Sequence, residues 1–131
     1  MPYRIGFFIT LHLKRALTQQ ELHNLAMNIV GKALEADGFE FMGVNSKLKK
    51  NPQFVCLRNK QLHFIVVRTV TYPEDPKVYD EDLMRKMKAH AAKFEATTYF
   101  AGVGLGNAVN VELPVYLNEA YVVDYDGLIE V

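Results

Sequence analysis

The stretch that decides the fold is QLHFIVVRTVT, residues Gln61–Thr71. It carries apolar side chains at both alternating sets of positions, which is typical of a central strand covered on both faces of its sheet. A second apolar run, Pro52–Arg58, precedes it, and the polar pair Asn59-Lys60 between the two runs predicts a tight hairpin turn. We therefore expect two adjacent antiparallel strands, the second of them in the interior of the sheet.

A first helix is predicted over Thr18–Asp37. Thr18 and Glu21 have the spacing of a capping box, and Leu17 is placed to pack on Leu22 as a hydrophobic staple. Gly38 follows the last turn, where a residue in the left-handed conformation commonly ends a helix. The spacing predicts one apolar stripe, made of Leu22, Leu25, Ala26, Ile29, Ala33 and Leu34.

A second helix is predicted over Asp80–Glu95. Asp80 is its expected cap, and Glu81 and Asp82 are favourably placed near the positive end of the helix dipole. Its expected buried side consists of Leu83, Met84, Met87, Ala91 and Phe94. A stripe of this kind belongs to a core, so we assign it no ligand.

The remaining strands are expected at Phe39–Val44, Thr97–Gly104, Ala120–Tyr125 and Leu128–Val131. The order of strand, helix and strand around Asp80–Glu95 favours a parallel pairing through a right-handed crossover. Asp126-Gly127 predicts a hairpin between the last two strands. Polar or proline-containing loops are expected at Asn45–Asn51 and Tyr72–Val78, and a turn at Gly102–Gly106. The chain is thus predicted to be one α/β domain over residues 1–131.

Composition narrows the possible partners. The chain of 131 residues is 50% hydrophobic, and 15 basic residues balance 15 acidic ones. The absence of a basic excess argues against a dedicated nucleic-acid domain, because phosphate contacts supply most of such binding. The apolar surplus and the zero net charge together predict self-association, most simply as a homodimer.

The single cysteine and the N-terminal segment bear on location. Cys56 lies in an apolar run, which predicts a buried thiol, and one free cysteine suits a reducing cytoplasm. Residues 3–13 are apolar but lack a cleavage site, so we expect a strand or packing arm and not a signal peptide. No stretch reaches the roughly 18 apolar residues of a membrane span. We therefore expect a cytoplasmic protein that does not enter the membrane.

Helix, three-strand meander, helix and strand follow one another in the order of the restriction-endonuclease-like core. The helix end Ala33–Phe39, with its Gly-aromatic pair, and the strand segment Phe64–Thr69 resemble the PD-(D/E)XK superfamily. The likeness is to its small bacterial members related to Holliday-junction resolvases, and it covers about Thr18 to Leu105. It implies an α-β-β-β-α-β core with a mixed sheet flanked by helices, followed here by extra C-terminal strands.

The catalytic residues of that superfamily are replaced in this chain. Its first acid corresponds to Pro52-Gln53, or to Phe54 if the register shifts by one, and its second acid corresponds to Val66. Its lysine corresponds to Arg68. Such nucleases need carboxylates to hold Mg²⁺, and neither Gln nor Val supplies a charged oxygen. Arg68 stays protonated and cannot act as a general base, so we expect no catalytic residue, no metal and no cofactor.

Several side chains nevertheless remain candidates for binding. Arg68 is expected either to pair structurally with an acid of the second helix or of the tail, or to touch a phosphate. Lys47, Lys49 and Lys50 form the main basic concentration, which is either a solvated loop or a nucleic-acid contact. The histidines show no metal-ligand spacing, and His63 is expected to be a structural histidine with satisfied hydrogen bonds.

The glycine-rich stretch Gly102–Gly106 lacks the third glycine of a dinucleotide fingerprint, since Asn107 stands there. It is expected to permit close backbone packing, and its alternative role is to cradle a phosphate-bearing ligand.

The sequence therefore predicts a non-catalytic nuclease-like domain that serves as a binding or assembly module. The first alternative is a weak nucleic-acid binder using Lys47–Lys50 and Arg68, with Gln53 beside them. The second is an enzyme of another class using Gly102–Gly106. The sequence identifies no small-molecule ligand.

Overall fold

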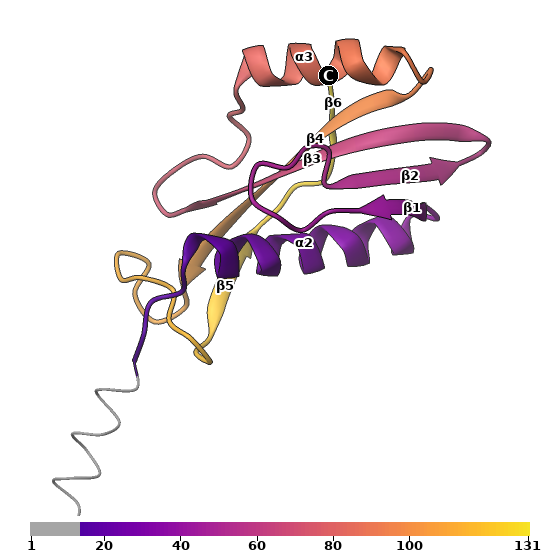
Figure 1. Ribbon diagram of the computed structural model, residues 1–131. Coiled ribbons are helices and arrows are strands. Elements are labelled where there is room, and N and C mark those ends of the chain that lie inside the picture. The colour runs from indigo at the N-terminus through magenta and orange to yellow at the C-terminus, as the bar shows by residue number, and fades with distance from the viewer. Residues whose placement is uncertain (1–13) are drawn as a thin grey trace, which may run out of the picture.

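The computed structural model of the protein describes residues 14–131 (Figure 1). The expected strand or packing arm at residues 3–13 lies outside the described residues. The elements are α2 (Gln19–Ala36), β1 (Glu40–Val44), β2 (Phe54–Arg58), β3 (Gln61–Thr71), α3 (Glu81–Ala92), β4 (Thr97–Asn107), β5 (Tyr121–Asp124) and β6 (Ile129–Glu130).

Six strands form one mixed sheet in which β3 and β4 are central. The order is β1-β2-β3-β4-β5, and β6 also pairs with β4. The meander β1–β2–β3 is antiparallel, whereas β3 and β4 run parallel, with Phe64 opposite Thr98 and Arg68 opposite Gly102. The helices α2 and α3 lie on opposite faces of the sheet (Figure 1). This confirms the predicted α/β class, the α-β-β-β-α-β core and the extra C-terminal strands.

Helix α2 begins and ends where the sequence predicts. The Thr18 side chain accepts a hydrogen bond from the Glu21 N–H, and the Glu21 carboxylate accepts one from the Thr18 N–H, so the capping box forms. Gly38 has φ +82° just beyond the helix, as expected. The last turn holds no basic residue, but Arg58 of β2 donates a hydrogen bond to the Asp37 carbonyl oxygen at 3.2 Å and lies over the Phe39 ring.

The buried stripe of α2 is rotated from the predicted one. The buried residues are Leu22, His23, Ala26, Met27, Val30 and Leu34. Leu25 and Ile29, which were predicted to belong to the stripe, are only partly buried. The prediction failed because it excluded a histidine from the stripe, whereas His23, Met27, Val30 and Leu34 recur at spacings of four, three and four residues.

The β2–β3 hairpin has the predicted turn. Asn59 and Lys60 both have positive φ, 52° and 64°, which a two-residue type I′ turn requires. Arg58 lies opposite Gln61 across the turn, and Phe54 lies opposite Ile65. Strand β2 begins at Phe54, two residues later than predicted, and Gln53 before it bonds to β3 through its backbone N–H and its side chain.

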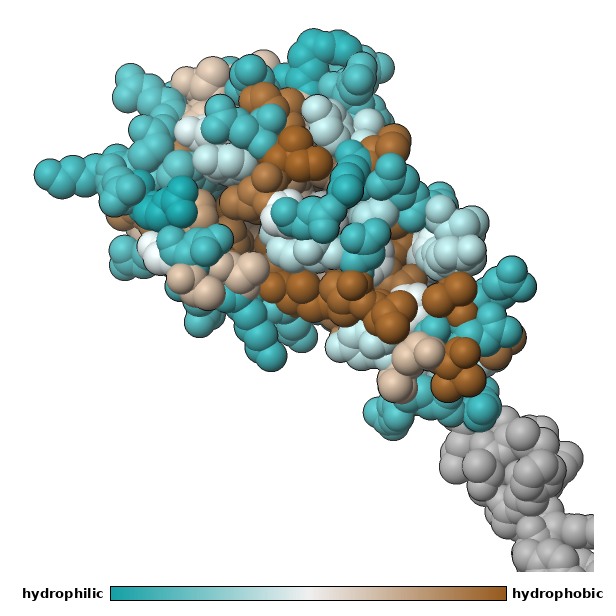
Figure 2. All heavy atoms as spheres, turned by 180° about the vertical axis from the view of Figure 1, so that it is seen from behind, coloured by the Kyte–Doolittle hydropathy of each residue, from teal (hydrophilic) through white to brown (hydrophobic). Residues whose placement is uncertain are grey.

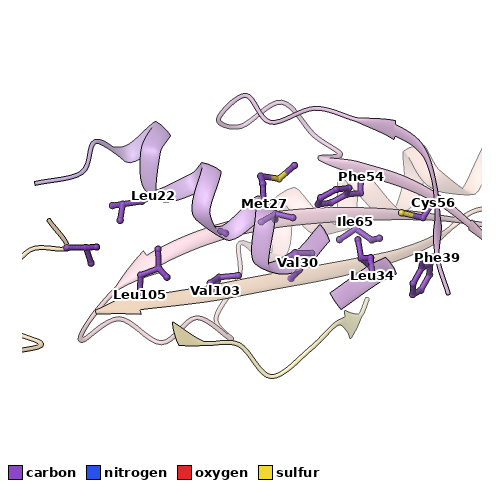
Figure 3. Close-up of a cluster of buried hydrophobic side chains, with 14 residues drawn as sticks. Leu22, Met27, Val30, Leu34, Phe39, Phe54, Cys56, Ile65, Val103 and Leu105 are labelled. Carbon is purple, nitrogen blue, oxygen red and sulfur yellow. The ribbon is translucent and has the colours of Figure 1, made fainter. Parts of the chain in front are cut away.

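The two faces of β3 belong to separate cores, as its apolar pattern predicts. Ile65 and Val67 pack with α2, together with Phe54, Leu34 and other side chains of a cluster shown in Figure 3. On the other face Phe64 and Val66 pack with Met84, Met87 and Ala91 of α3. Burying an aliphatic side chain of this size contributes roughly 1.5–3 kcal/mol, so both helices hold β3 in place.

Helix α3 is shorter than predicted, and Phe94 is a correction. Asp80 caps it by accepting a hydrogen bond from the Leu83 N–H at 3.1 Å, as expected. The helix ends at Ala92, and Glu95 adopts φ +56° in the turn toward β4. Phe94 therefore lies beyond the helix with 53% of its surface exposed, and its ring centroid is 5.7 Å from that of Phe64 and 5.4 Å from that of His90.

The C-terminal strands differ from the prediction in two ways. Strand β4 continues to Asn107, so the expected turn at Gly102–Gly106 is wrong. The hairpin around Asp126-Gly127 is also wrong, because β5 and β6 both pair with β4 and not with each other. Gly104 lies opposite Asp124, and Phe100 lies opposite Ile129. Local turn chemistry does not show that two short strands follow one another along the same neighbour.

Candidate functional site

The three positions predicted to correspond to nuclease catalytic residues are Gln53, just before β2, and Val66 and Arg68 on β3. The β2–β3 ladder ends at the pair of Phe54 and Ile65. The first residue of β2 therefore lies next to these three positions. Beyond that pair, both the backbone N–H and the side chain of Gln53 form hydrogen bonds with β3. The arrangement therefore brings the three predicted positions to one region of the sheet.

Gln53 is fully buried and all its strong hydrogen-bonding groups have partners. Its N–H donates to the Ile65 carbonyl oxygen at 3.0 Å, and its carbonyl oxygen accepts from the Asn45 N–H at 2.8 Å. Its side-chain Oε1 accepts from the Val67 N–H at 2.7 Å. Its Nε2 donates to the Lys50 carbonyl oxygen at 3.1 Å and to Asn51 Oδ1 at 3.0 Å.

This geometry requires an amide. The side chain must accept on one side and donate on the other, and an ionised carboxylate only accepts. An acid at position 53 would face two oxygen atoms in a buried site with no donor to offer them. Gln53 is therefore a structural residue that fastens the Asn45–Asn51 loop to β3, and its amide is not presented to a ligand.

Val66 and Arg68 both make structural contacts, but of different kinds. Val66 is completely buried against α3. Arg68 is half-buried, and its Nη1 donates to the Val67 carbonyl oxygen at 2.9 Å. Burial lowers the pKa of Arg68, and the negative charge of Asp80 opposes that change.

The structure thus favours the structural reading of Arg68, with one correction. Among the described residues no carboxylate lies within 4.0 Å of its guanidinium, and Asp80 acts through its charge at longer range.

His23 is a buried polar residue that the sequence reasoning missed. It is 1% exposed on α2, and its Nε2 has no hydrogen-bond partner among residues 14–131. Burial and the positive charge of Arg68 lower its pKa, so the ring is neutral near pH 7. The signal was available in the spacing of His23 with Met27 and Val30, which places the histidine on the buried stripe.

His63 only partly fits its expected role. Its ring lies between those of Phe39 and Tyr99, with centroid distances of 5.2 and 5.6 Å. Its Nδ1 has no partner within the described part of the chain, so its hydrogen bonds are not fully satisfied as predicted. Burial lowers the pKa of His63. It packs as an aromatic ring, not as a ligand.

Lys47, Lys49 and Lys50 lie on the exposed loop before β2. None of them forms an ion pair with a carboxylate within residues 14–131. The hydrogen bond from Gln53 to the Lys50 carbonyl oxygen places this loop beside the strand that carries Arg68. The loop therefore offers free positive charge, whereas Arg68 is held against the backbone.

The glycines of β4 serve backbone packing. A Cβ added at Gly102 would overlap the carbonyl oxygen of Pro76, so only glycine allows the Tyr72–Val78 loop to lie on the strand. Gly104 and Gly106 pair with β5. This confirms the close-packing interpretation, and the sheet already engages the backbone that a phosphate cradle would need.

The pattern of a domain of unknown function, DUF8840, matches residues 20–131, which include almost all of α2 and every strand. The chain belongs to this family. No curated protein and no solved structure matches it.

The described part of this DUF8840 protein has neither a metal-binding cluster nor a membrane-spanning helix. Across residues 14–131, no three side chains of His, Cys, Asp or Glu gather closely enough to hold a metal ion. No helix in that range has the length and apolar character needed to cross a membrane.

Proposed function

We propose that this DUF8840 protein is a non-catalytic member of the restriction-endonuclease-like fold that acts as a binding or assembly module. The observation that carries the proposal is the bonding of Gln53. At the position of the first nuclease acid, the fold has built a site that accepts a neutral amide and rejects a carboxylate. Together with the buried Val66, this leaves Mg²⁺ without charged oxygen ligands there.

A cleavage assay tests the absence of catalysis. Plasmid, linear and four-way-junction DNA are incubated with the protein and Mg²⁺ or Mn²⁺. We expect no cleavage above that of buffer alone, because no carboxylate pair is present at this site to hold the metal. Metal-dependent cleavage that disappears in Arg68→Ala would refute the proposal, since it would show that this site is catalytic.

The assembly part of the proposal rests on the free edge of the sheet at β1. Met42 and Val44 on this strand are each 58% exposed, and β1 has only β2 as a neighbour among the described strands. Two copies meeting at this edge would bury these side chains in a symmetric contact, and the zero net charge gives little repulsion. We therefore propose a homodimer, located in the cytoplasm as its single thiol favours.

Light scattering after size exclusion tests the homodimer at micromolar concentration. We expect a dimer mass for the wild type and a monomer mass for Val44→Lys, because a buried, unpaired charge at the contact is costly. Val109→Lys is the matched control, since Val109 is 89% exposed and lies outside β1. A wild-type monomer would overturn the homodimer, and a dimer of unchanged stability in Val44→Lys would remove β1 from the contact.

A second candidate function is weak nucleic-acid binding through the lysine loop, favoured by the three lysines that lack ion pairs. A mobility-shift titration against salt would show a shift at low salt that weakens steeply as salt rises. Replacing Lys47, Lys49 and Lys50 with Gln should abolish the shift. Replacing the exposed Lys86, Lys88 and Lys93 with Gln is the control of equal charge. The absence of any low-salt shift would eliminate this function.

A further inference from the structure

Two adjoining hollows lie where the parallel strands β3 and β4 end. Their volumes are about 130 and 280 Å³, and they share four lining residues, Tyr72, Leu105, Gly106 and Val111. A Cβ added at Gly106 would lie 3.2 Å from the Val122 side chain and 3.6 Å from that of Val111. The absence of a side chain at Gly106 therefore keeps this space open.

The rims of the two hollows expose apolar side chains. Between 38% and 53% of the surface is exposed in each of Tyr72, Val111, Leu113, Val122 and Val123. Figure 2 shows hydrophobic side chains on the surface at the end of the molecule where the described chain begins. Exposed apolar side chains that gather in this way, with polar residues around them, are typical of an interaction site.

The charged residues that line the two hollows are all acidic. Glu74 and Asp124 line the smaller hollow, and Glu112 lines the larger one. None of these carboxylates forms an ion pair with a basic residue of the described chain. Lys77, whose charge reaches Asp124 at longer range, is itself paired with Asp126 at 2.7 Å. The rim therefore presents negative charge that the described fold does not neutralise by direct pairing.

The same charge bias extends over the C-terminal part of the chain, which supplies most of the lining residues. Residues 94–131 contain six acidic residues and no Lys, Arg or His. A cationic partner would meet a complementary potential at this surface, whereas an anionic partner such as nucleic acid would be repelled. Charge therefore selects the kind of partner that the apolar hollows can accept.

The volumes of the hollows limit the size of what can enter them. A cavity of about 150 Å³ holds a group the size of benzene, whereas sites for whole small-molecule ligands are commonly about 300–1,000 Å³. The smaller hollow is therefore sized for one apolar side chain. Because the two hollows adjoin, they suit neighbouring side chains of a single peptide segment.

We propose that the two hollows bind a segment of a partner protein that carries apolar side chains together with Lys or Arg. The apolar side chains enter the hollows, and the cations lie beside Glu74, Glu112 and Asp124. The exposed ring of Tyr72, which lines both hollows, offers its face to a further cation. The proposal rests on the binding role proposed above and gives that role a class of partner.

Fluorescence anisotropy on the full chain tests this site with labelled peptides of about eight residues. The probe alternates Leu with Lys, and two control peptides alternate Leu with Glu and Ser with Lys. We expect saturable binding of the Leu-Lys peptide at low salt, and binding at least about tenfold weaker for each control peptide. Equal binding of the Leu-Glu peptide, or no binding of the Leu-Lys peptide up to about 1 mM, overturns the proposal.

Neutralising the acidic rim tests its part in binding. We expect the combined change Glu74→Gln, Glu112→Gln and Asp124→Asn to weaken Leu-Lys binding at least about tenfold, since three ion pairs are lost together. A control protein loses the same charge by replacement with Gln at three exposed acids elsewhere, Glu35, Glu40 and Glu95. Its affinity should change less than about threefold. Equal affinities of the two triple variants would show that the rim does not hold the cations.

The apolar contact is tested by Val111→Ser, because Val111 lines both hollows. We expect this change to weaken Leu-Lys binding at least about threefold. Val109→Ser on the same loop is the matched control, since Val109 is 89% exposed and lines neither hollow, and it should bind as the wild type does. Thermal unfolding checks that both variants are folded. Equal affinities of these two variants would contradict binding in the hollows.

Two further outcomes separate this site from the dimer proposed at β1, which lies at the other end of the strand order. Val44→Lys should bind the Leu-Lys peptide as tightly as the wild type. A protein that dimerises through β1 but binds no peptide would lose this site and keep its assembly role. Conversely, loss of the dimer mass in the variant with the neutralised rim would identify a second copy as the occupant, which refutes the proposed partner.

Discussion

Gln53 shows how a polar residue can occupy a position that resembles a catalytic one and still be structural. Its carboxamide joins the Lys50 carbonyl oxygen and Asn51 on one side to the Val67 N–H on the other. Because the group is buried, each unmade bond would cost roughly 1–3 kcal/mol. The side chain thus adds a hydrogen bond to β3 beside the one that the Gln53 N–H makes to the Ile65 carbonyl oxygen.

Introducing an acid at position 53 should therefore destabilise the protein. We expect Gln53→Glu to lower the free energy of unfolding by about 2–3 kcal/mol at pH 7, because the carboxylate loses both donated bonds and is desolvated. The loss should shrink as the pH falls toward 5, where a protonated acid regains a donor. Urea unfolding measures both effects.

Gln19→Glu, the same change at an exposed glutamine in the first turn of α2, is the control for Gln53→Glu and should shift stability by less than about 1 kcal/mol. Equal stability of Gln53→Glu and the wild type at pH 7 would contradict the structural role.

His23 predicts a pH dependence of stability. Its pKa is lowered in the folded state, so the unfolded chain takes up a proton first as the pH falls below the usual histidine value of about 6.5. The stability that comes from neutral His23 is present above that value and is lost as the pH falls. Urea unfolding at pH 5, 6 and 7 should show a shallower decline in His23→Met, by up to about 1.4 kcal/mol per pH unit. Parallel declines would contradict this role, since His63 contributes equally to both proteins.

At the scale of elements, the glycines of β4 are needed where another part of the backbone packs closely on the strand. The Tyr72–Val78 loop crosses this strand, and the Pro76 carbonyl oxygen occupies the space that a side chain at Gly102 would need. In β1, by contrast, a Cβ at Gly43 would have its nearest neighbour, Val55 Cβ, at 3.9 Å. A side chain at Gly102 would therefore clash with backbone, whereas a side chain at Gly43 would have room.

Alanine substitutions should separate these two glycines. We expect Gly102→Ala to destabilise the protein by about 3 kcal/mol or more, because the obstacle is backbone and cannot rotate away. Gly43→Ala should stay within about 1 kcal/mol of the wild type. Thermal and urea unfolding of the two variants measure the difference. Similar losses of stability in both variants would show that the loop containing Pro76 can move to make room for the side chain.

The elements that the sequence predicted correctly are those with local causes. The Thr18 capping box, the Asn59-Lys60 turn and the two-sided apolar pattern of β3 each act within a few residues, so their outcome can be predicted from the chain alone. The partner of β5 is β4, where Gly104 lies opposite Asp124, a residue far from it in sequence. The role of Gln53 likewise depends on Val67, fourteen residues later, and no local pattern predicts that bond.

At the scale of the whole molecule, one sheet carries two different free edges. The edge at β1 exposes Met42 and Val44, and the edge at β5 exposes Tyr121, Val122 and Val123. Our proposal assigns the edge at β1 to a second copy. It predicts that Val44→Lys changes the mass of the assembly without changing amide exchange in β5.

The single thiol reports on the stability of the entire fold. Cys56 is fully buried in β2 between β1 and β3, and burial raises its pKa to about 11. A thiol reagent at pH 8 should therefore react only when the sheet opens, at least about 10³-fold more slowly than with a small free thiol. The free energy derived from this slowing should match that from urea unfolding, because separating β2 from both neighbours disrupts the core. Labelling at the rate of a free thiol would show that β1 and β2 open independently of the remaining sheet.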